Sequence, residues 1–280
     1  MKKTLKKLSS LLLTAMVSLS CMNYPVHAQE TNAMPTKEQF ATAEELKTFD
    51  TNDNDGTTNP AKVYFGNNNQ QWWIVGSQND DSMTLFAASP LATDESFSLD
   101  QNVKSYDKDW NCTYPEGVTI TEVNPDHYGA SNIRARLKSL ETSYFSNEEQ
   151  KLMKDTTIYT DDTKNGVVYS TTDKLYLGYG DTNSHYMTVG ANTSDNLNNG
   201  LHIDNTYCNK GGSSFTGSLL RRGRGLLLPG SSSAFWVLIM NAGGITSNAT
   251  VTSLTSIYPA FELNLSSVLF ASAASAASYY

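Results

Sequence analysis

The fold class is decided by residues 128–153, YGASNIRARLKSLETSYFSNEEQKLM, which carry the strongest helical patterns of the chain. From Ser131 to Tyr144 the apolar side chains recur at helical spacing and form one stripe. The stripe consists of Ile133, Leu137, Leu140 and Tyr144. A second helix is predicted from Ser146, because Ser146 and Glu149 form a capping box. These residues therefore predict a central pair of short helices.

Strand-type runs lie on both sides of this helical pair and are separated by turns rich in Asn, Asp and Gly. The predicted strands are 63–65, 71–75, 83–87, 157–159, 167–170, 174–177, 186–189, 235–240 and 258–265. We therefore predict an α+β domain over residues 60–270, with mainly antiparallel β-structure. Trp72 and Trp73 point to opposite faces of an extended strand, so at least one belongs to the core and the other is a candidate stacking platform.

Residues 1–28 have the three parts of a secretory signal peptide. Four lysines precede an apolar run at 8–19, and Val26-His27-Ala28 follows as a cleavage site with small residues at its first and third positions. We predict cleavage after Ala28 and a secreted, extracellular or cell-envelope location. Lipidation at Cys21 is a minor alternative, because residues 18–21 match a lipoprotein signal only loosely. The apolar run is shorter than the ~20 residues that cross a bilayer, so no transmembrane segment is predicted.

Residues 29–59 form a polar leader with one short helix, predicted over 36–49 from a capping box and apolar residues at helical spacing. The acidic run that follows superficially resembles a calcium loop. Thr51 and Lys62 occupy the loop positions that require Asp and Glu, so a solvated turn is favoured, calcium is unsupported and no cofactor is predicted. At the other end, the Ala/Ser-rich residues 271–280 are predicted to be a tail or linker.

The charge of the chain limits its partners. Cleavage after Ala28 removes four lysines and no acid, which takes the formal net charge from −8 to −12. An acidic protein repels phosphate backbones and anionic lipids, so nucleic acid and membrane surfaces are not expected ligands. The exception is the basic cluster Arg221, Arg222 and Arg224, which is a candidate anion dock or internal ion-pair patch. The basic residues Arg134, Arg136 and Lys138 are assigned to a solvated face or to carboxylate pairing.

Cys112 and Cys208 survive cleavage of the signal peptide. An oxidising exterior allows them to form a disulfide if the fold brings them together. Two separate buried thiols are the alternative. No spacing of Cys and His residues predicts a metal site.

No catalytic motif is present. The sequence contains no Gly-x-Ser-x-Gly elbow, no His-Glu-x-x-His helix and no glycine-rich phosphate loop. His127, His185 and His202 stand apart in polar loops, which favours surface histidines. Acid pairs such as Asp161 and Asp162 leave a glycan-active hydrolase open as a minor alternative.

Four strings carry a family resemblance: YGASNIRARL at 128–137, YFSNEEQKLM at 144–153, YSTTDKLYLGYGD at 169–181 and YPAFELNLSSVLFASAA at 258–274. Together they resemble the secreted bacterial proteins grouped as domain of unknown function 6273, over about residues 60–272. The resemblance implies a cell-exterior domain with a C-type-lectin-like or sulfatase-modifying-type fold.

The chain departs from the usual pattern of that family in two places. Members usually carry a Trp-Leu-Arg segment followed by a Val-Arg-Pro or Val-Pro ending. Here residues 218–221 and 257–260 take those places, without the tryptophan and the second arginine. This departure leaves open whether residues 215–230 are native-like or frame-disrupted.

Long polar loops on short strands favour recognition, because they supply adaptable hydrogen bonds and aromatic contact area. We therefore expect a non-enzymatic domain that binds carbohydrate or a surface protein through loops of the C-terminal half. Its candidate contacts are Tyr176, Tyr179, Tyr186 and Trp236, since sugar faces stack on aromatic rings. A passive structural or display module of a surface protein is the alternative.

Overall fold

The computed structural model describes part of the chain in detail. The described residues are 40–41, 62–67, 70–76, 81–180, 187–191, 193–197, 199–203, 218–222, 236–241, 244–267 and 271–275. Within these ranges the protein is an α+β structure of mainly antiparallel sheets with two short α-helices. No helix in these ranges is long and apolar enough to span a membrane.

One sheet has the strand order β1-β18-β2-β3-β4-β17, and its neighbours pair antiparallel throughout. Its strands are β1 (Phe40–Ala41), β2 (Lys62–Tyr64), β3 (Gln71–Gly76), β4 (Ser82–Ala87), β17 (Ala260–Asn264) and β18 (Ala271–Ser275). The pairing of β17 with β4 joins residues nearly 180 positions apart, as in Glu262 opposite Thr84. The last third of the chain thus completes a sheet that the first third begins.

A second sheet has the order β12-β11-β10-β13-β14-β15, and β16 links β13 to β5. The pairs β10–β13 and β13–β16 are parallel, and the others are antiparallel. The bounds are β5 (Ala92–Glu95), β10 (Tyr179–Gly180), β11 (Met187–Val189), β12 (Leu201–Ile203), β13 (Ser218–Arg222), β14 (Trp236–Asn241), β15 (Gly244–Thr250) and β16 (Thr255–Ile257).

Two small two-stranded sheets and three 3-10 turns complete the described architecture. One pairs β6 (Lys104–Ser105) with β7 (Glu122–Val123), and the other is the hairpin of β8 (Thr156–Asp162) and β9 (Val167–Asp173). The 3-10 turns are η2 (Lys108–Trp110), η3 (Tyr128–Ala130) and η5 (Leu265–Ser267).

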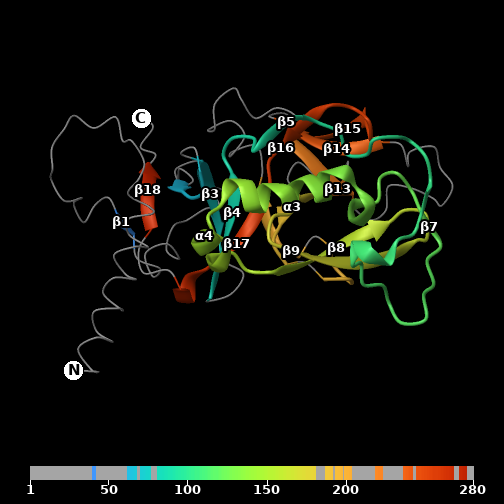
Figure 1. Ribbon diagram of the computed structural model, residues 1–280, viewed down its shortest axis with the longest axis horizontal. Coiled ribbons are helices and arrows are strands. Elements are labelled where there is room, and N and C mark those ends of the chain that lie inside the picture. The colour runs from blue at the N-terminus through green and yellow to red at the C-terminus, as the bar shows by residue number, and fades with distance from the viewer. Residues whose placement is uncertain are drawn as a thin grey trace.

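The central helical pair is confirmed. Helix α3 covers Asn132–Tyr144, and the Ser131 side chain caps it by accepting from the Arg134 N–H. Helix α4 covers Asn147–Leu152 and begins with the predicted capping box of Ser146 and Glu149. Figure 1 shows α3 lying across one face of the molecule, in front of strands from both large sheets. Its buried stripe therefore joins the two sheets in one core.

Both consecutive tryptophans of β3 belong to that core, so the prediction of a stacking platform at Trp72 or Trp73 is wrong. Trp72 is fully buried and meets the Phe261 ring edge-on at 4.8 Å between centroids. Trp73 is also buried, with the Lys62 ammonium 3.9 Å above its ring. The second face of β3 is covered by neighbouring structure, which alternation along a strand does not reveal.

Three predicted elements differ from the structure. Phe40 and Ala41 form β1 where a helix was predicted over 36–49, and the remainder of that segment lies outside the described residues. Residues 271–275 form β18, whereas a linker-like tail was predicted from their composition. The run 174–177 makes a single bridge, from Tyr176 to Ala260, in place of the predicted strand. Strand pairing with distant partners decided the first two cases, because pairing can override local preference.

Candidate functional site

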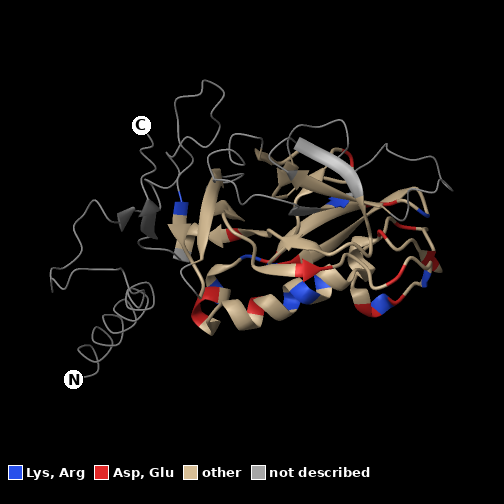
Figure 2. Ribbon diagram, turned by 90° about the horizontal axis from the view of Figure 1, so that it is seen from above, with Lys and Arg blue, Asp and Glu red and all other residues tan. Residues whose placement is uncertain are grey.

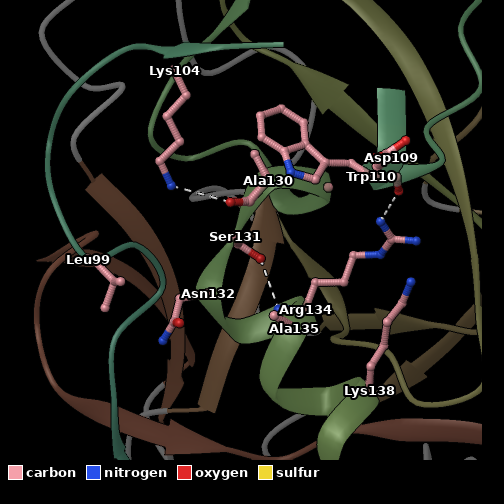
Figure 3. Close-up of a pocket in the computed structure, with 11 residues that line it drawn as sticks. Leu99, Lys104, Asp109, Trp110, Ala130, Ser131, Asn132, Arg134, Ala135 and Lys138 are labelled. Carbon is pink, nitrogen blue, oxygen red and sulfur yellow. Dashed lines mark hydrogen bonds between the residues drawn. The ribbon is translucent and has the colours of Figure 1, made fainter. Parts of the chain in front are cut away.

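A pocket of about 300 Å³ opens beside the first turns of α3. Five short segments line it: the loop after β5, strand β6, the 3-10 turns η2 and η3, and the first half of α3 with its N-cap. The lining residues are Leu99, Lys104, Asp109, Trp110, Gly129, Ala130, Ser131, Asn132, Arg134, Ala135 and Lys138. In Figure 3 Lys104 and Leu99 lie on one side of the pocket, Arg134 and Lys138 lie on the other, and the Trp110 indole lies between them.

The turn η2 holds the indole in place. Asp107 caps the turn by accepting from the Asp109 N–H at 2.9 Å, and Asn111 ends it in a left-handed conformation with φ 53°. The Trp110 carbonyl accepts a hydrogen bond from Arg134 Nη1 of α3. Tyr106 packs edge-on against the indole at 5.7 Å between centroids. The Trp110 backbone is thus held by α3, and its half-buried indole packs against Tyr106 while it also lines the pocket.

Arg134 is the deepest basic residue of the pocket, and its charge is already compensated. Its Nε and Nη2 both lie 2.9 Å from Asp173 Oδ1, and both side chains are buried. This pair joins α3 to the end of β9. Arg136 likewise pairs with Glu95 at 2.7 Å. Carboxylate pairing, one of the two alternatives for the basic residues of α3, is therefore confirmed for Arg134 and Arg136.

Lys104 and Lys138 differ from those two arginines. Neither ammonium has a carboxylate oxygen within 4.0 Å in the described part of the chain. Lys104 Nζ donates to the Ala130 carbonyl at 3.3 Å, which uses one of its three donors. Burial lowers the pKa of Lys104, and the charge of Asp100 opposes that shift. Figure 2 shows the basic residues of α3 on its N-terminal half. This half of the helix lines the pocket.

A buried polar network lies behind the pocket wall. His127, predicted as a surface histidine, is 2% exposed and stacks on the Tyr169 ring at 4.3 Å. Its Nε2 lies 2.8 Å from the Tyr114 hydroxyl, which donates to Asp162 at 2.9 Å. Its Nδ1 accepts from the Ala130 N–H at 3.1 Å. Burial lowers the pKa of His127 to about 3, and the charges of Arg134 and Lys104 act in the same direction.

This network is not arranged as a nucleophile and base. The Nδ1 lone pair of His127 is occupied by a backbone N–H, and Nε2 is engaged with Tyr114. The nearby Cys112 thiol is mostly buried, and burial raises its pKa to about 12, so the thiolate that reacts is scarce at neutral pH. Within the described ranges no group of three or more His, Cys, Asp and Glu side chains is placed to hold a metal ion. The geometry favours a structural role for His127 and Cys112.

Two of the four tyrosine and tryptophan contacts predicted from sequence are core residues. Tyr176 is fully buried, and its hydroxyl donates to Glu262 at 2.9 Å. Tyr179 is 2% exposed and packs in a small cluster with Val168 and Leu197. Their assignment as ligand contacts is corrected, because the sheets bury the glycine- and tyrosine-rich segment that resembles a surface loop.

The other predicted residues have different outcomes. Trp236 is exposed at 40% at the start of β14, away from the pocket lining. Tyr186 and Cys208 lie outside the described residues. Because these two residues are not described, the pairing of Cys112 with Cys208 and the contact role of Tyr186 stay predictions. Cys112 itself carries a free thiol in the structure.

Arg221 is an internal residue and not a surface anion dock. It is fully buried in β13, where its Nε donates to the Leu177 carbonyl at 2.7 Å and its Nη1 donates to Thr160 Oγ1 at 3.0 Å. Its guanidinium lies 5.8 Å from the Tyr128 ring centroid. Residues 218–222 form a paired strand, while the side chain of Arg222 and all of Arg224 lie outside what the structure describes.

Sequence reasoning did not single out the pocket residues Trp110 and Lys104. It assigned Lys138 to a solvated face or to carboxylate pairing, and Lys138 is exposed on α3. A signal was present, since Trp110 stands in the strongly polar run Asp107–Asn111, where an aromatic residue has no apolar neighbours to pack with locally. The convergence of that turn with α3 depends on tertiary contacts. No pattern of spacing along the chain shows it.

Comparison with known proteins finds no match to a family model, to a curated protein or to a solved structure.

Proposed function

We propose that this protein is a non-enzymatic recognition domain of the cell exterior, and that it binds carbohydrate in the pocket beside Trp110. The observation that carries the proposal is the fixed indole in a pocket with polar side chains on both sides. Sugars bind proteins through C–H faces that lie on aromatic rings and through hydroxyl groups that meet polar side chains. The pocket offers both kinds of contact.

The location and the family are parts of the same proposal. The signal-peptide pattern of residues 1–28 supports export. The antiparallel sheets with two short helices are compatible with the C-type-lectin-like arrangement that the resemblance to domain of unknown function 6273 implies. Mass spectrometry of the secreted protein tests the proposed export, since a mature N-terminus at Gln29 is expected.

Binding is favoured over glycan hydrolysis by the composition of the pocket. Glycosidases of the common type place two carboxyl groups on either side of the scissile bond. Among the pocket residues only Asp109 carries a carboxyl group. The nearby acids Asp162 and Asp173 are buried and accept hydrogen bonds from Tyr114 and Arg134.

A glycan array with the mature protein tests the proposal, and two tryptophan variants locate the site. Trp110→Ala is expected to abolish glycan binding, because it removes the stacking surface. Trp236→Ala removes the exposed tryptophan of β14 and is expected to leave binding intact. Circular dichroism melts of both variants establish that they are folded.

Loss of glycan binding in Trp236→Ala, with binding retained in Trp110→Ala, would place the site at β14 and overturn the assignment of the pocket. An array without any bound glycan, together with capture of a cell-surface protein, would replace carbohydrate recognition by protein adhesion. Turnover of a bound glycan by the mature protein would overturn the non-enzymatic part.

A further inference from the structure

We infer that the pocket beside Trp110 recognises an acidic sugar, one that carries a carboxylate, and that the positive charges of Lys104 and Lys138 attract this carboxylate from the two sides of the indole. The inference rests on the proposed function and names its ligand class. It follows from the two ammonium groups without a carboxylate partner, from the neutralised Arg134 beside Lys138 and from Asp109, the single acid of the lining.

The two lysines are the available cations of the site. Within the described residues, Lys151, Lys164 and Lys174 each have a carboxylate oxygen within 4.0 Å, at 3.4, 3.2 and 3.3 Å. Lys104 and Lys138 lack such a partner, as do Lys62, Lys108 and Lys154, but of these described lysines only Lys104 and Lys138 line the pocket. Charges are screened over ~8 Å at physiological salt, so acids beyond that distance contribute little to the potential inside the pocket, where Asp109 is the one acid of the lining.

Arg134 organises the pocket without supplying its charge to a ligand. Its Nε and Nη2 are both bonded to Asp173, and Nη1 is bonded to the Trp110 carbonyl. It therefore holds the Trp110 backbone against α3, and its charge is compensated by Asp173. Arg134 is a positioning residue, and the lysines remain to meet an anion.

The arrangement of the lining suits a sugar ring with one negative charge. Lys104 and Lys138 approach from opposite sides in Figure 3, and the indole lies between them. Asp109 on the rim can accept hydrogen bonds from sugar hydroxyls, and Asn132 can donate or accept them. With the charge of Arg134 already compensated, the two ammonium groups and the Asp109 carboxylate leave the lining with one net positive charge, which one carboxylate on the ligand neutralises.

Isothermal titration calorimetry with matched probes tests this inference. The probes are oligosaccharides of galacturonate and of glucuronate, and the same oligosaccharides after reduction of their carboxyl groups to alcohols. At least one acidic probe is expected to bind about tenfold or more tightly than its reduced form, because a hydrogen bond to a charged group is worth more than a neutral one.

Lysine variants test whether the acidic sugar binds in the pocket. Lys104→Gln and Lys138→Gln are each expected to weaken binding of the acidic probe about tenfold. Each variant is also expected to lower the ratio of the affinity for the acidic probe to the affinity for the reduced probe. Lys151→Gln changes an exposed lysine on α4 that pairs with Glu148, and it is expected to leave both affinities unchanged.

The outcomes separate this inference from the proposed function. Equal binding of acidic and reduced probes, lost in Trp110→Ala, would overturn the acidic ligand and leave carbohydrate recognition standing. Preference for a sulfated or phosphorylated glycan over the carboxylated one would also overturn it. Failure to bind any glycan, on the array and in calorimetry, would overturn both.

Discussion

Arg134 of α3 and Asp173 of β9 form a buried ion pair in which two guanidinium nitrogens lie 2.9 Å from one carboxylate oxygen. The pair connects the helix that lines the pocket to the hairpin that carries Asp162. A further bond from the same guanidinium reaches the Trp110 carbonyl. The position of the proposed stacking surface is therefore coupled to the internal packing of the domain.

Asp173→Asn is expected to destabilise the protein by about 3 kcal/mol, because it leaves the buried Arg134 charge without its counter-ion. Urea denaturation measures the change in the free energy of unfolding. Glu95→Gln is the control, since Glu95 pairs with the partly exposed Arg136 and such a pair contributes less than about 1 kcal/mol. Equal losses in the two variants would contradict the structural role assigned to the buried pair.

Acidification is expected to destabilise the protein through His127. Its pKa falls from 6.5 to about 3 in the folded state, so between these values the unfolded chain binds more protons than the folded one. Stability therefore rises with pH across this window, and it is lost at about 1.4 kcal/mol per unit as the pH falls below 6.5. Urea midpoints between pH 7 and pH 4 measure the slope.

The variant His127→Gln is expected to reduce that slope, whereas His202→Gln, which replaces an exposed histidine, retains most of it. The comparison of the two variants separates the effect of His127 from that of acids such as Glu262. Burial raises the pKa of Glu262, so this residue makes the stability fall as the pH rises, which is opposite to the effect of His127. An unchanged slope in His127→Gln would show that another group controls the acid sensitivity.

Native Cys112 is expected to react with iodoacetamide at pH 8 roughly a hundredfold or more slowly than it does in urea. The reason is that burial raises its pKa to about 12, so little thiolate forms. Peptide mass spectrometry of a Cys208→Ser variant measures the rate without interference from the second thiol. In the unmodified chain, resistance to alkylation in urea without a reductant would instead reveal the disulfide with Cys208.

Tyr176→Phe is expected to lower the free energy of unfolding by about 2 kcal/mol and to leave glycan affinity unchanged. The substitution removes the hydroxyl that donates to the buried Glu262 carboxyl group. Tyr144→Phe is the matched control, because within the described residues the Tyr144 hydroxyl has no hydrogen-bond partner. A selective loss of glycan binding in Tyr176→Phe would restore the surface role that burial argues against.

Much of the local structure of this protein was predictable from its sequence. Helix α3 follows from the apolar stripe Ile133, Leu137 and Leu140, and the start of α4 follows from the capping box at Ser146. The strands β3 and β4 were predicted within one or two residues. These features depend on residues close together in the chain, where periodicity and capping act.

The candidate site was decided by tertiary structure. Trp110, Lys104 and Lys138 are spread over 35 positions of polar sequence, and only the packing of η2 against α3 gathers them around one pocket. Conversely, Tyr176 stands in a glycine- and tyrosine-rich segment that resembles a surface loop, but its backbone bridge to Ala260 places it in the core. The sequence by itself determined which segments become helix or strand, because those preferences are local. Contacts between distant segments determined which side chains are exposed, and therefore where a ligand can bind.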